Sequence, residues 1–191
     1  MQSRSALRKQ ISEAWAHTID DAYNDRLINS ERGLQVYFCS ALLDEWKDSA
    51  GHRRIFVEPS LTIPGLSVPK YPDVVICNSK SVIGVIELKY QPRAKPSFAK
   101  DIDTLSKIRD AKDRILLSND RYRGVEGSGT EYSIAKDAVF CWAGVYSATE
   151  PSFNFSLPKE MNGRFFSLHA ATGIGRRPHV KRIEFDLKEY S

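Results

Sequence analysis

The chain has 191 residues, 41% of them hydrophobic, so it is long enough to form one domain with a full core. Its 28 basic and 24 acidic side chains give a net charge of +4, which permits an anionic partner without requiring one. No stretch approaches about 18 uninterrupted apolar residues, and the N-terminus lacks the apolar core of a signal peptide, so we expect no membrane association.

The cysteines and histidines exclude several site classes. Cys39, Cys77 and Cys141 lie far apart in apolar stretches, without zinc-ligand spacing, so we expect buried free thiols in a reducing, cytoplasmic compartment. The histidines are scattered, and no nucleophile elbow, phosphate-binding loop or Cys–His pair is present. Those enzyme classes are therefore disfavoured.

Two helices are predicted at the start of the chain. The first runs from about Ser5 to Leu27, because apolar residues recur there every three or four positions. Its apolar stripe packs either on the core or on a second subunit. Asn29 or Ser30 is placed to cap a second helix that runs to Trp46 and lies against a sheet.

Glu31, in the first turn of that second helix, has two interpretations. Acids are common in first turns because they complement the helix dipole. However, the helix directly precedes the predicted sheet, so Glu31 is also a candidate site residue.

A first strand is predicted from Arg54 to Leu61, ending at Pro59 or soon after. Within it, Glu58 is either a peripheral acid of a site or an exposed strand-end residue, and the second interpretation is favoured. A connection rich in proline and glycine then leads to Tyr71-Pro72-Asp73.

The next stretch predicts a β-hairpin. Two apolar runs, 72–77 and 82–90, flank a short polar turn. Because side chains alternate along a strand, Glu87 and Lys89 share one face, and Asp73 shares a face with Val75. A register that brings Asp73 level with Glu87 gathers two acids and one ammonium group at one point. Such a point suits a hard divalent cation bound through oxygens.

A simpler interpretation is an ordinary amphipathic hairpin with a surface Glu–Lys pair. It is disfavoured because Asp73 and Glu87 adjoin strongly apolar runs, where charges are costly unless they are paired or bound to metal. In the basic loop that follows, Arg93 and Lys95 either meet phosphates or are simply solvated.

The remaining elements are predicted in chain order. Ser97 is expected to cap a helix from Phe98 to about Leu117, and residues 118–136 are expected to form a long loop. That loop holds Arg121-Tyr122-Arg123, a weak nucleic-acid signal that is more often plain surface. Three further segments read as strands: Ala138–Tyr146, Arg164–Ala170 and Val180–Leu187. The first is apolar throughout, as in a strand buried on both faces, and the preceding helix predicts that it lies parallel to the Glu87 strand.

Pro72-Asp73 followed by Glu87-Leu88-Lys89 resembles the signature of the PD-(D/E)XK nuclease superfamily. The resemblance implies a restriction-endonuclease-like α/β fold with an αβββαβ core, a central mixed sheet flanked by helices. Residues 30–147 would form this core within a single domain over 1–191, after a helical extension over 1–29 and before C-terminal strands over 148–191.

The resemblance also implies an activity, namely hydrolysis of nucleic-acid phosphodiester bonds, with DNA favoured, using Mg²⁺ or Mn²⁺. Asp73, Glu87 and the backbone carbonyl of Leu88 would bind the metal, and Glu31 would add an outer or second-metal ligand. Lys89 would orient the attacking water and offset phosphate charge. We favour that role over proton abstraction, because the neighbouring acids raise the pKa of a lysine. A homodimer through the first helix is compatible with this activity.

Two other functions remain open. One is a catalytically silent member of the same fold that serves as a binding or structural subunit. The other is an unrelated α/β domain that binds a protein through its N-terminal helix and Trp15, and it predicts no acidic cluster around Asp73 and Glu87.

Overall fold

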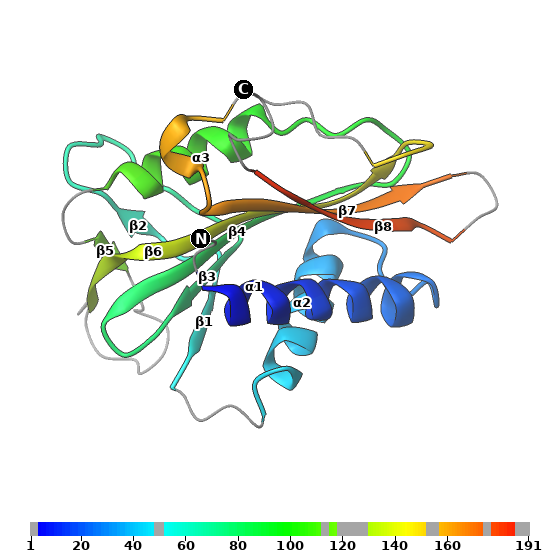
Figure 1. The fold of residues 1–191 in the computed structure, drawn as a ribbon, viewed down its shortest axis with the longest axis horizontal. Coiled ribbons are helices and arrows are strands. Elements are labelled where there is room, and N and C mark those ends of the chain that lie inside the picture. The colour runs from blue at the N-terminus through cyan, green and yellow to red at the C-terminus, as the bar shows by residue number, and fades with distance from the viewer. Residues whose placement is uncertain are drawn as a thin grey trace.

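The computed structural model describes residues 4–47, 52–111, 115–117, 130–151, 157–173 and 177–185. Over these ranges the chain has an α/β fold with a mixed, curled sheet between helices (Figure 1). The helical segments are α1 (Ser5–His17), a π-helical continuation (Thr18–Tyr23), α2 (Glu31–Asp44), α3 (Ala99–Asp110) and a 3-10 turn (Lys159–Met161). The strands are β1 (Arg54–Val57), β2 (Leu61–Thr62), β3 (Val74–Cys77), β4 (Ser81–Gln91), β5 (Ile115–Leu117), β6 (Thr130–Ser147), β7 (Phe165–Thr172) and β8 (His179–Glu184).

The sheet runs in the order β1-β3-β4-β6 and continues from β6 through β7 to β8. β3 is antiparallel to both β1 and β4, whereas β6 is parallel to both β4 and β7. β5 and β2 extend the sheet from the first residues of β6. The chain passes from β4 to β6 through α3, so the predicted parallel pairing is confirmed.

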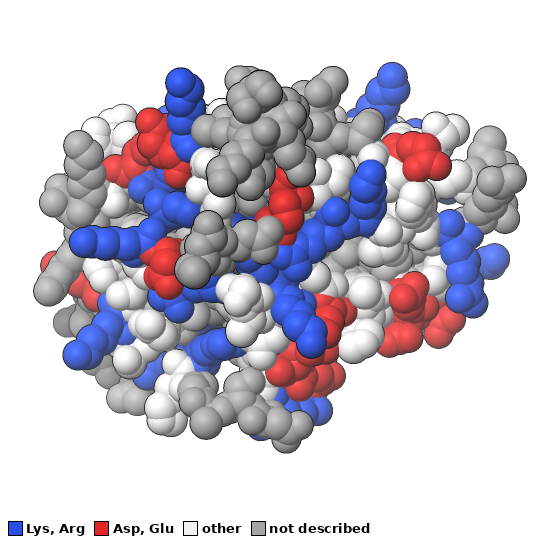
Figure 2. Space-filling model, viewed as in Figure 1, with Lys and Arg blue, Asp and Glu red and all other residues white. Residues whose placement is uncertain are grey.

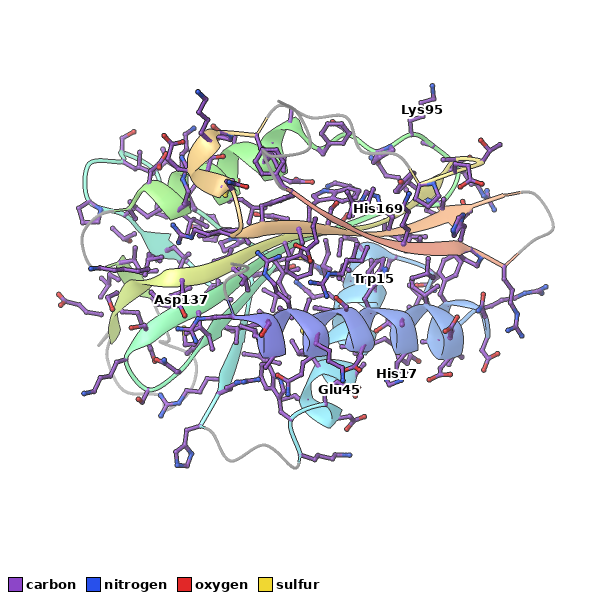
Figure 3. The ribbon with its side chains drawn as sticks, viewed as in Figure 1. Trp15, His17, Glu45, Lys95, Asp137 and His169 are labelled. Atoms are coloured by element: carbon purple, nitrogen blue, oxygen red, sulfur yellow. The ribbon has the colours of Figure 1, made fainter. Side chains whose placement is uncertain are left out.

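Helices cover both faces of this sheet. α1 and α2 lie on one face and α3 on the other (Figure 1). Trp15 of α1 is fully buried, between the helix and the sheet, with its ring centroid 6.3 Å from that of Phe38 (Figure 3). The first helix therefore packs its apolar stripe on the core, and Trp15 is a core residue rather than an exposed contact.

The start of α2 is fixed by a side-chain cap. Ser30 accepts a hydrogen bond from the backbone N–H of Gly33 at 3.1 Å, which satisfies one of the free donors of the first turn. Leu34, Phe38 and Leu42 then face the sheet and are fully buried. Of the two predicted caps, Asn29 and Ser30, Ser30 is the one observed, and Glu31 is the first residue of the helix.

The prediction of a helix over 98–117 is wrong at both ends. Ser97 is not its cap: Phe98 occupies the cap position, and the N–H of Ser97 donates to Oε1 of Gln91 instead. α3 ends at Asp110, and Ile115–Leu117 forms β5. Ile115 and Leu117 are fully buried there, so packing within the sheet outweighs the helical spacing of these residues.

Three other boundaries also differ from the predictions. The loop expected over 118–136 ends earlier, because β6 begins at Thr130; residues 118–129, with Arg121-Tyr122-Arg123, lie outside the described residues. The first strand stops at Val57, where Glu58 adopts a left-handed φ of 46°. The last strand ends at Glu184, and Leu187 lies outside the described residues.

Cys77 and Cys141 are buried and Cys39 is half-buried, and all three are free thiols. Burial raises the pKa of both Cys39 and Cys77 to about 12, so these thiols are poor nucleophiles. In the ranges given above, every helix is too short or too polar to span a bilayer.

Replacing Gly144 with alanine should destabilise the fold, because this position in β6 has no room for a side chain. A Cβ atom there would overlap the indole of Trp142, with two ring carbons only 2.8 Å away. Because Trp142 is fully buried and has little room to move, we expect the free energy of unfolding, measured in urea, to fall by about 1–3 kcal/mol. Gly173→Ala is the control, since a Cβ atom added there would have no neighbour within 4 Å; equal losses in both variants would contradict this packing argument.

Candidate acid site

The hairpin brings two acids to one point. Val74 of β3 pairs with Ile86 of β4, and one further step in this register places Asp73 opposite Glu87. The carboxyl groups of Asp73 and Glu87 are close enough to shift each other's pKa. Oδ2 of Asp73 also accepts a hydrogen bond from the backbone N–H of Leu88 at 2.6 Å. The two acids therefore lie on the same side of the sheet, as the alternation along the strands predicts.

Burial controls the charge of this pair. It raises the pKa of Asp73 to about 6, and Leu88 and Glu87 oppose that rise by donating hydrogen bonds to the Asp73 carboxylate. It raises the pKa of Glu87 to about 10, and the negative charges of Asp73 and Asp101 add to the effect. At neutral pH the pair therefore holds one proton, which Glu87 donates to Asp73. A second negative charge is stable here only if a cation offsets it.

Lys89 supplies a positive charge beside the pair. Its Nζ atom lies 3.7 Å from Oδ2 of Asp101 and 3.7 Å from Oε2 of Glu31. Burial lowers the pKa of Lys89, but the surrounding carboxylates outweigh burial, so the pKa is raised overall. Lys89 thus stays protonated, as the sequence argument expected, and acts by charge and position rather than as a base.

Asp101 of α3 is a site residue that sequence reasoning did not select. It is buried, and its Oδ2 accepts a hydrogen bond from Nε1 of Trp142 at 3.1 Å while also facing Lys89. Burial raises the pKa of Asp101, whereas Lys89 and the Trp142 hydrogen bond lower it. It lies in the stretch Lys100-Asp101-Ile102-Asp103, and the sequence alone does not tell the buried Asp101 from the exposed Asp103.

Glu31 contacts the site at its edge. Its Oε2 accepts a hydrogen bond from the backbone N–H of Tyr90 at 3.1 Å and faces Lys89. Its side chain is 45% exposed, in contrast to the buried Glu87. The structure therefore places Glu31 next to Lys89, and its role as a metal ligand stays a prediction.

A pocket of about 310 Å³ opens beside Asp73, between the start of α2 and the hairpin. Gln35 and Glu58 line it, and both are anchored to the backbone carbonyl of Asp73: the side chain of Gln35 donates to it at 3.0 Å and the N–H of Glu58 at 2.9 Å. Gln35 was not selected as a site residue from the sequence, and it is 7% exposed. Glu58 is exposed, as favoured from the sequence, although it borders this pocket.

The basic loop after β4 gives no evidence for a contact with the acid pair. Arg93 and Lys95 are exposed, and Lys95 extends away from the body of the molecule (Figure 3). On the face shown in Figure 2, basic and acidic side chains are interspersed rather than separated into surfaces of one sign. This face therefore offers no extended basic surface to a polyanion.

The oxygen chemistry of the acid pair fits a hard divalent cation. Mg²⁺ is commonly bound through one or two carboxylates and retains several waters. Asp73 and Glu87 provide two carboxyl groups at opposed positions of the hairpin, and a bound cation would take the place of the proton that they hold. Over the described ranges, no group of three or more His, Cys, Asp or Glu side chains is placed to hold a metal ion. The pair would therefore depend on backbone oxygen and water for its remaining ligands.

Comparisons with protein families, with curated proteins and with solved structures returned no significant match for this chain.

Replacing Glu87 with glutamine should stabilise the metal-free protein at high pH. The native pair keeps a proton that an unfolded glutamate, with its usual pKa of 4.5, releases. The contribution of Glu87 to the free energy of unfolding therefore falls as the pH rises from 4.5 to about 10. Glutamine has no proton to lose. We therefore expect the free energy of unfolding of Glu87→Gln to exceed that of wild type by about 1 kcal/mol at the upper end of this range.

Urea unfolding in EDTA at several pH values measures this effect. Glu13→Gln is the matched control, because the Glu13 side chain is 41% exposed on α1 beside Lys9 and should show no such pH-dependent gain. A Glu87→Gln variant that loses stability equally at every pH would show that the native carboxyl group is not under electrostatic stress.

Proposed function

We propose that this protein is a metal-dependent nuclease of the PD-(D/E)XK type that hydrolyses phosphodiester bonds of nucleic acid, with DNA favoured, using Mg²⁺ or Mn²⁺. One observation carries the proposal: the β3–β4 register places Asp73 opposite Glu87, and Lys89 lies on the same face of β4 as Glu87. The motif is visible in the sequence alone, and this geometry supports it. If the short strands β2 and β5 are set aside, the order α2, β1, β3, β4, α3 and β6 is compatible with an αβββαβ core.

The side chains have distinct roles in this proposal. Asp73 and Glu87 would hold the cation, together with the backbone carbonyl of Leu88. A bound divalent cation polarises a phosphate oxygen and lowers the pKa of a water molecule. Lys89 stays charged, so it stabilises the negative charge that develops on the phosphate and orients the attacking water.

Asp101 and Glu31 would position Lys89. Both carboxylates lie 3.7 Å from its Nζ atom, and Asp101 is itself held by Trp142. These contacts limit the rotamers that the lysine can adopt, which reduces the cost of ordering it in the transition state.

The second candidate is a silent nuclease fold that binds without cleaving. The proton shared by Asp73 and Glu87 favours it in one respect, since metal binding must displace that proton. The third candidate, a protein-binding domain that uses Trp15, is weakened because Trp15 is fully buried and an acid pair is present.

A cleavage assay separates the first two candidates. With labelled single-stranded DNA, duplex DNA and RNA, wild-type protein should cleave at least one substrate with Mg²⁺ or Mn²⁺ and none in EDTA. We expect Asp73→Asn and Lys89→Ala to lower the rate by about 100-fold or more, because each removes a charge acting on the transition state.

Asp103→Asn is the matched control, because Asp103 lies on the exposed side of α3 and pairs with Lys107. It should retain wild-type activity. Cleavage that survives in both site variants would refute the assignment, and a wild-type protein that binds nucleic acid but never cleaves it would identify the silent fold.

A further inference from the structure

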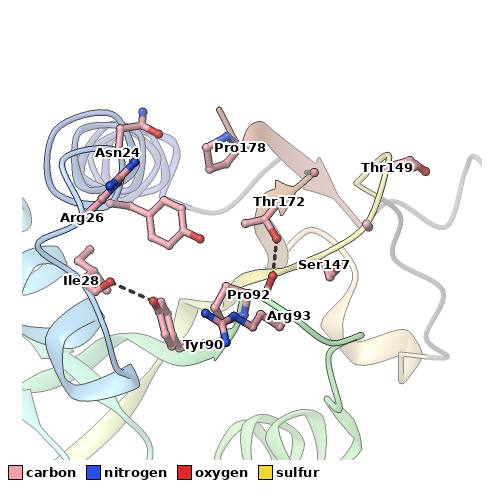
Figure 4. Close-up of a pocket in the computed structure, with 13 residues that line it drawn as sticks. Asn24, Arg26, Ile28, Tyr90, Pro92, Arg93, Ser147, Thr149, Thr172 and Pro178 are labelled. Atoms are coloured by element: carbon pink, nitrogen blue, oxygen red, sulfur yellow. Dashed lines mark hydrogen bonds between the residues drawn. The ribbon is translucent and has the colours of Figure 1, made fainter. Parts of the chain in front are cut away.

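A second, larger hollow lies beside the acid site. It has a volume of about 940 Å³ and is enclosed by the end of the π-helical segment, the loop after β4 and the ends of β6 and β7 (Figure 4). Two of its walls, residues 23–28 and 90–93, continue directly into segments that line the pocket beside Asp73. Tyr90 joins the two spaces, since its N–H donates to Glu31 and it follows Lys89 in β4.

Two arginines reach this hollow from different walls. Arg26 follows the π-helical segment and Arg93 follows β4 (Figure 4). Both are exposed, and neither forms an ion pair with a carboxylate in the described part of the chain. Other arginines do so: Arg4 pairs with Asp137 at 2.7 Å and Arg8 with Glu184 at 2.6 Å. The hollow therefore presents two guanidinium groups available to an anion.

The backbone at Arg26 is unusual. Its φ of 62° lies in the left-handed region, where a residue with a Cβ atom is disfavoured and glycine is not. The conformation belongs to the end of the π-helical segment, where the N–H of Leu27 donates to the carbonyl of Ala22 at 3.0 Å across Arg26. The side chain of Arg26 places a cation at the rim of the hollow.

Aromatic rings complete the lining. Tyr23 and Tyr90 meet edge to face, with ring centroids 6.3 Å apart. The hydroxyl of Tyr90 is fixed by a hydrogen bond to the backbone oxygen of Ile28 at 2.9 Å (Figure 4). Tyr23 is only half-buried. Aromatic surface next to cations is how proteins bind single-stranded nucleic acid, because bases stack on the rings while the cations hold the phosphates.

We propose that this hollow is a binding site for a single-stranded nucleic-acid segment that leads to the acid pair. Arg26 and Arg93 hold its phosphates, and the tyrosines contact a base. The volume lies in the range of pockets that enclose a small ligand, so it suits a short stretch of one strand rather than the broad surface of a duplex. The inference rests on the proposed nuclease function for its choice of ligand.

Fluorescence anisotropy with a labelled oligothymidylate in EDTA tests the site without cleavage. We expect Arg26→Gly and Arg93→Ala each to weaken binding by about 5- to 10-fold and to lower the salt dependence by about one unit. Glycine is chosen at Arg26 because it accepts the left-handed backbone, so the variant should fold at least as well as wild type. Lys9→Ala is the control: it removes one positive charge from the exposed face of α1 and should leave binding unchanged.

The outcomes separate the two proposals. Equal binding by wild type, the arginine variants and Lys9→Ala would overturn the inference, even if the protein cleaves DNA. Tighter binding of a duplex than of the single strand, or binding of inorganic phosphate alone, would overturn it too. Arginine-dependent binding without cleavage in Mg²⁺ would support this site while the nuclease assignment fails.

Discussion

The acid pair imposes the main constraint on this structure. Asp73 and Glu87 are held together by the register of an antiparallel hairpin whose apolar residues are buried on both faces. Glu87 is buried and Asp73 is half-buried, so burial raises the pKa of both and one proton is retained between them. Burying two neighbouring carboxyl groups lowers the stability of the fold. Such groups are common at sites where a bound cation or substrate offsets their charge.

The surrounding elements can be understood as supports for this pair. The parallel crossover through α3 brings Asp101 over the end of β4, where it faces Lys89 and accepts a hydrogen bond from Trp142. In the β4–β6 register Lys89 lies beside Gly144, and the missing side chain there makes room for the Trp142 ring. Gly144 and Trp142 of β6 and Asp101 of α3 thus limit the position of one lysine.

Local patterns predicted much of this arrangement. The hairpin, the α2 cap at Ser30 and the parallel pairing of β4 with β6 depend on short-range signals and on the chirality of crossovers, and these are visible in one sequence. The register of two adjacent strands was enough to place Asp73 opposite Glu87. Asp101 and Gln35 escaped prediction because their burial depends on how helices dock on the sheet. β5 escaped it too, because its three residues become a strand only when β6 and β2 are beside them.

The central claim is that the two carboxyl groups share one divalent cation. Anomalous diffraction from crystals soaked in Mn²⁺ tests it most directly, because the signal locates the metal independently of activity. The account predicts a peak in contact with both Asp73 and Glu87 in wild-type protein, and its loss in Asp73→Asn crystals. Saturating Mn²⁺ with no peak between these carboxyl groups, or with peaks only elsewhere on the protein, would contradict it.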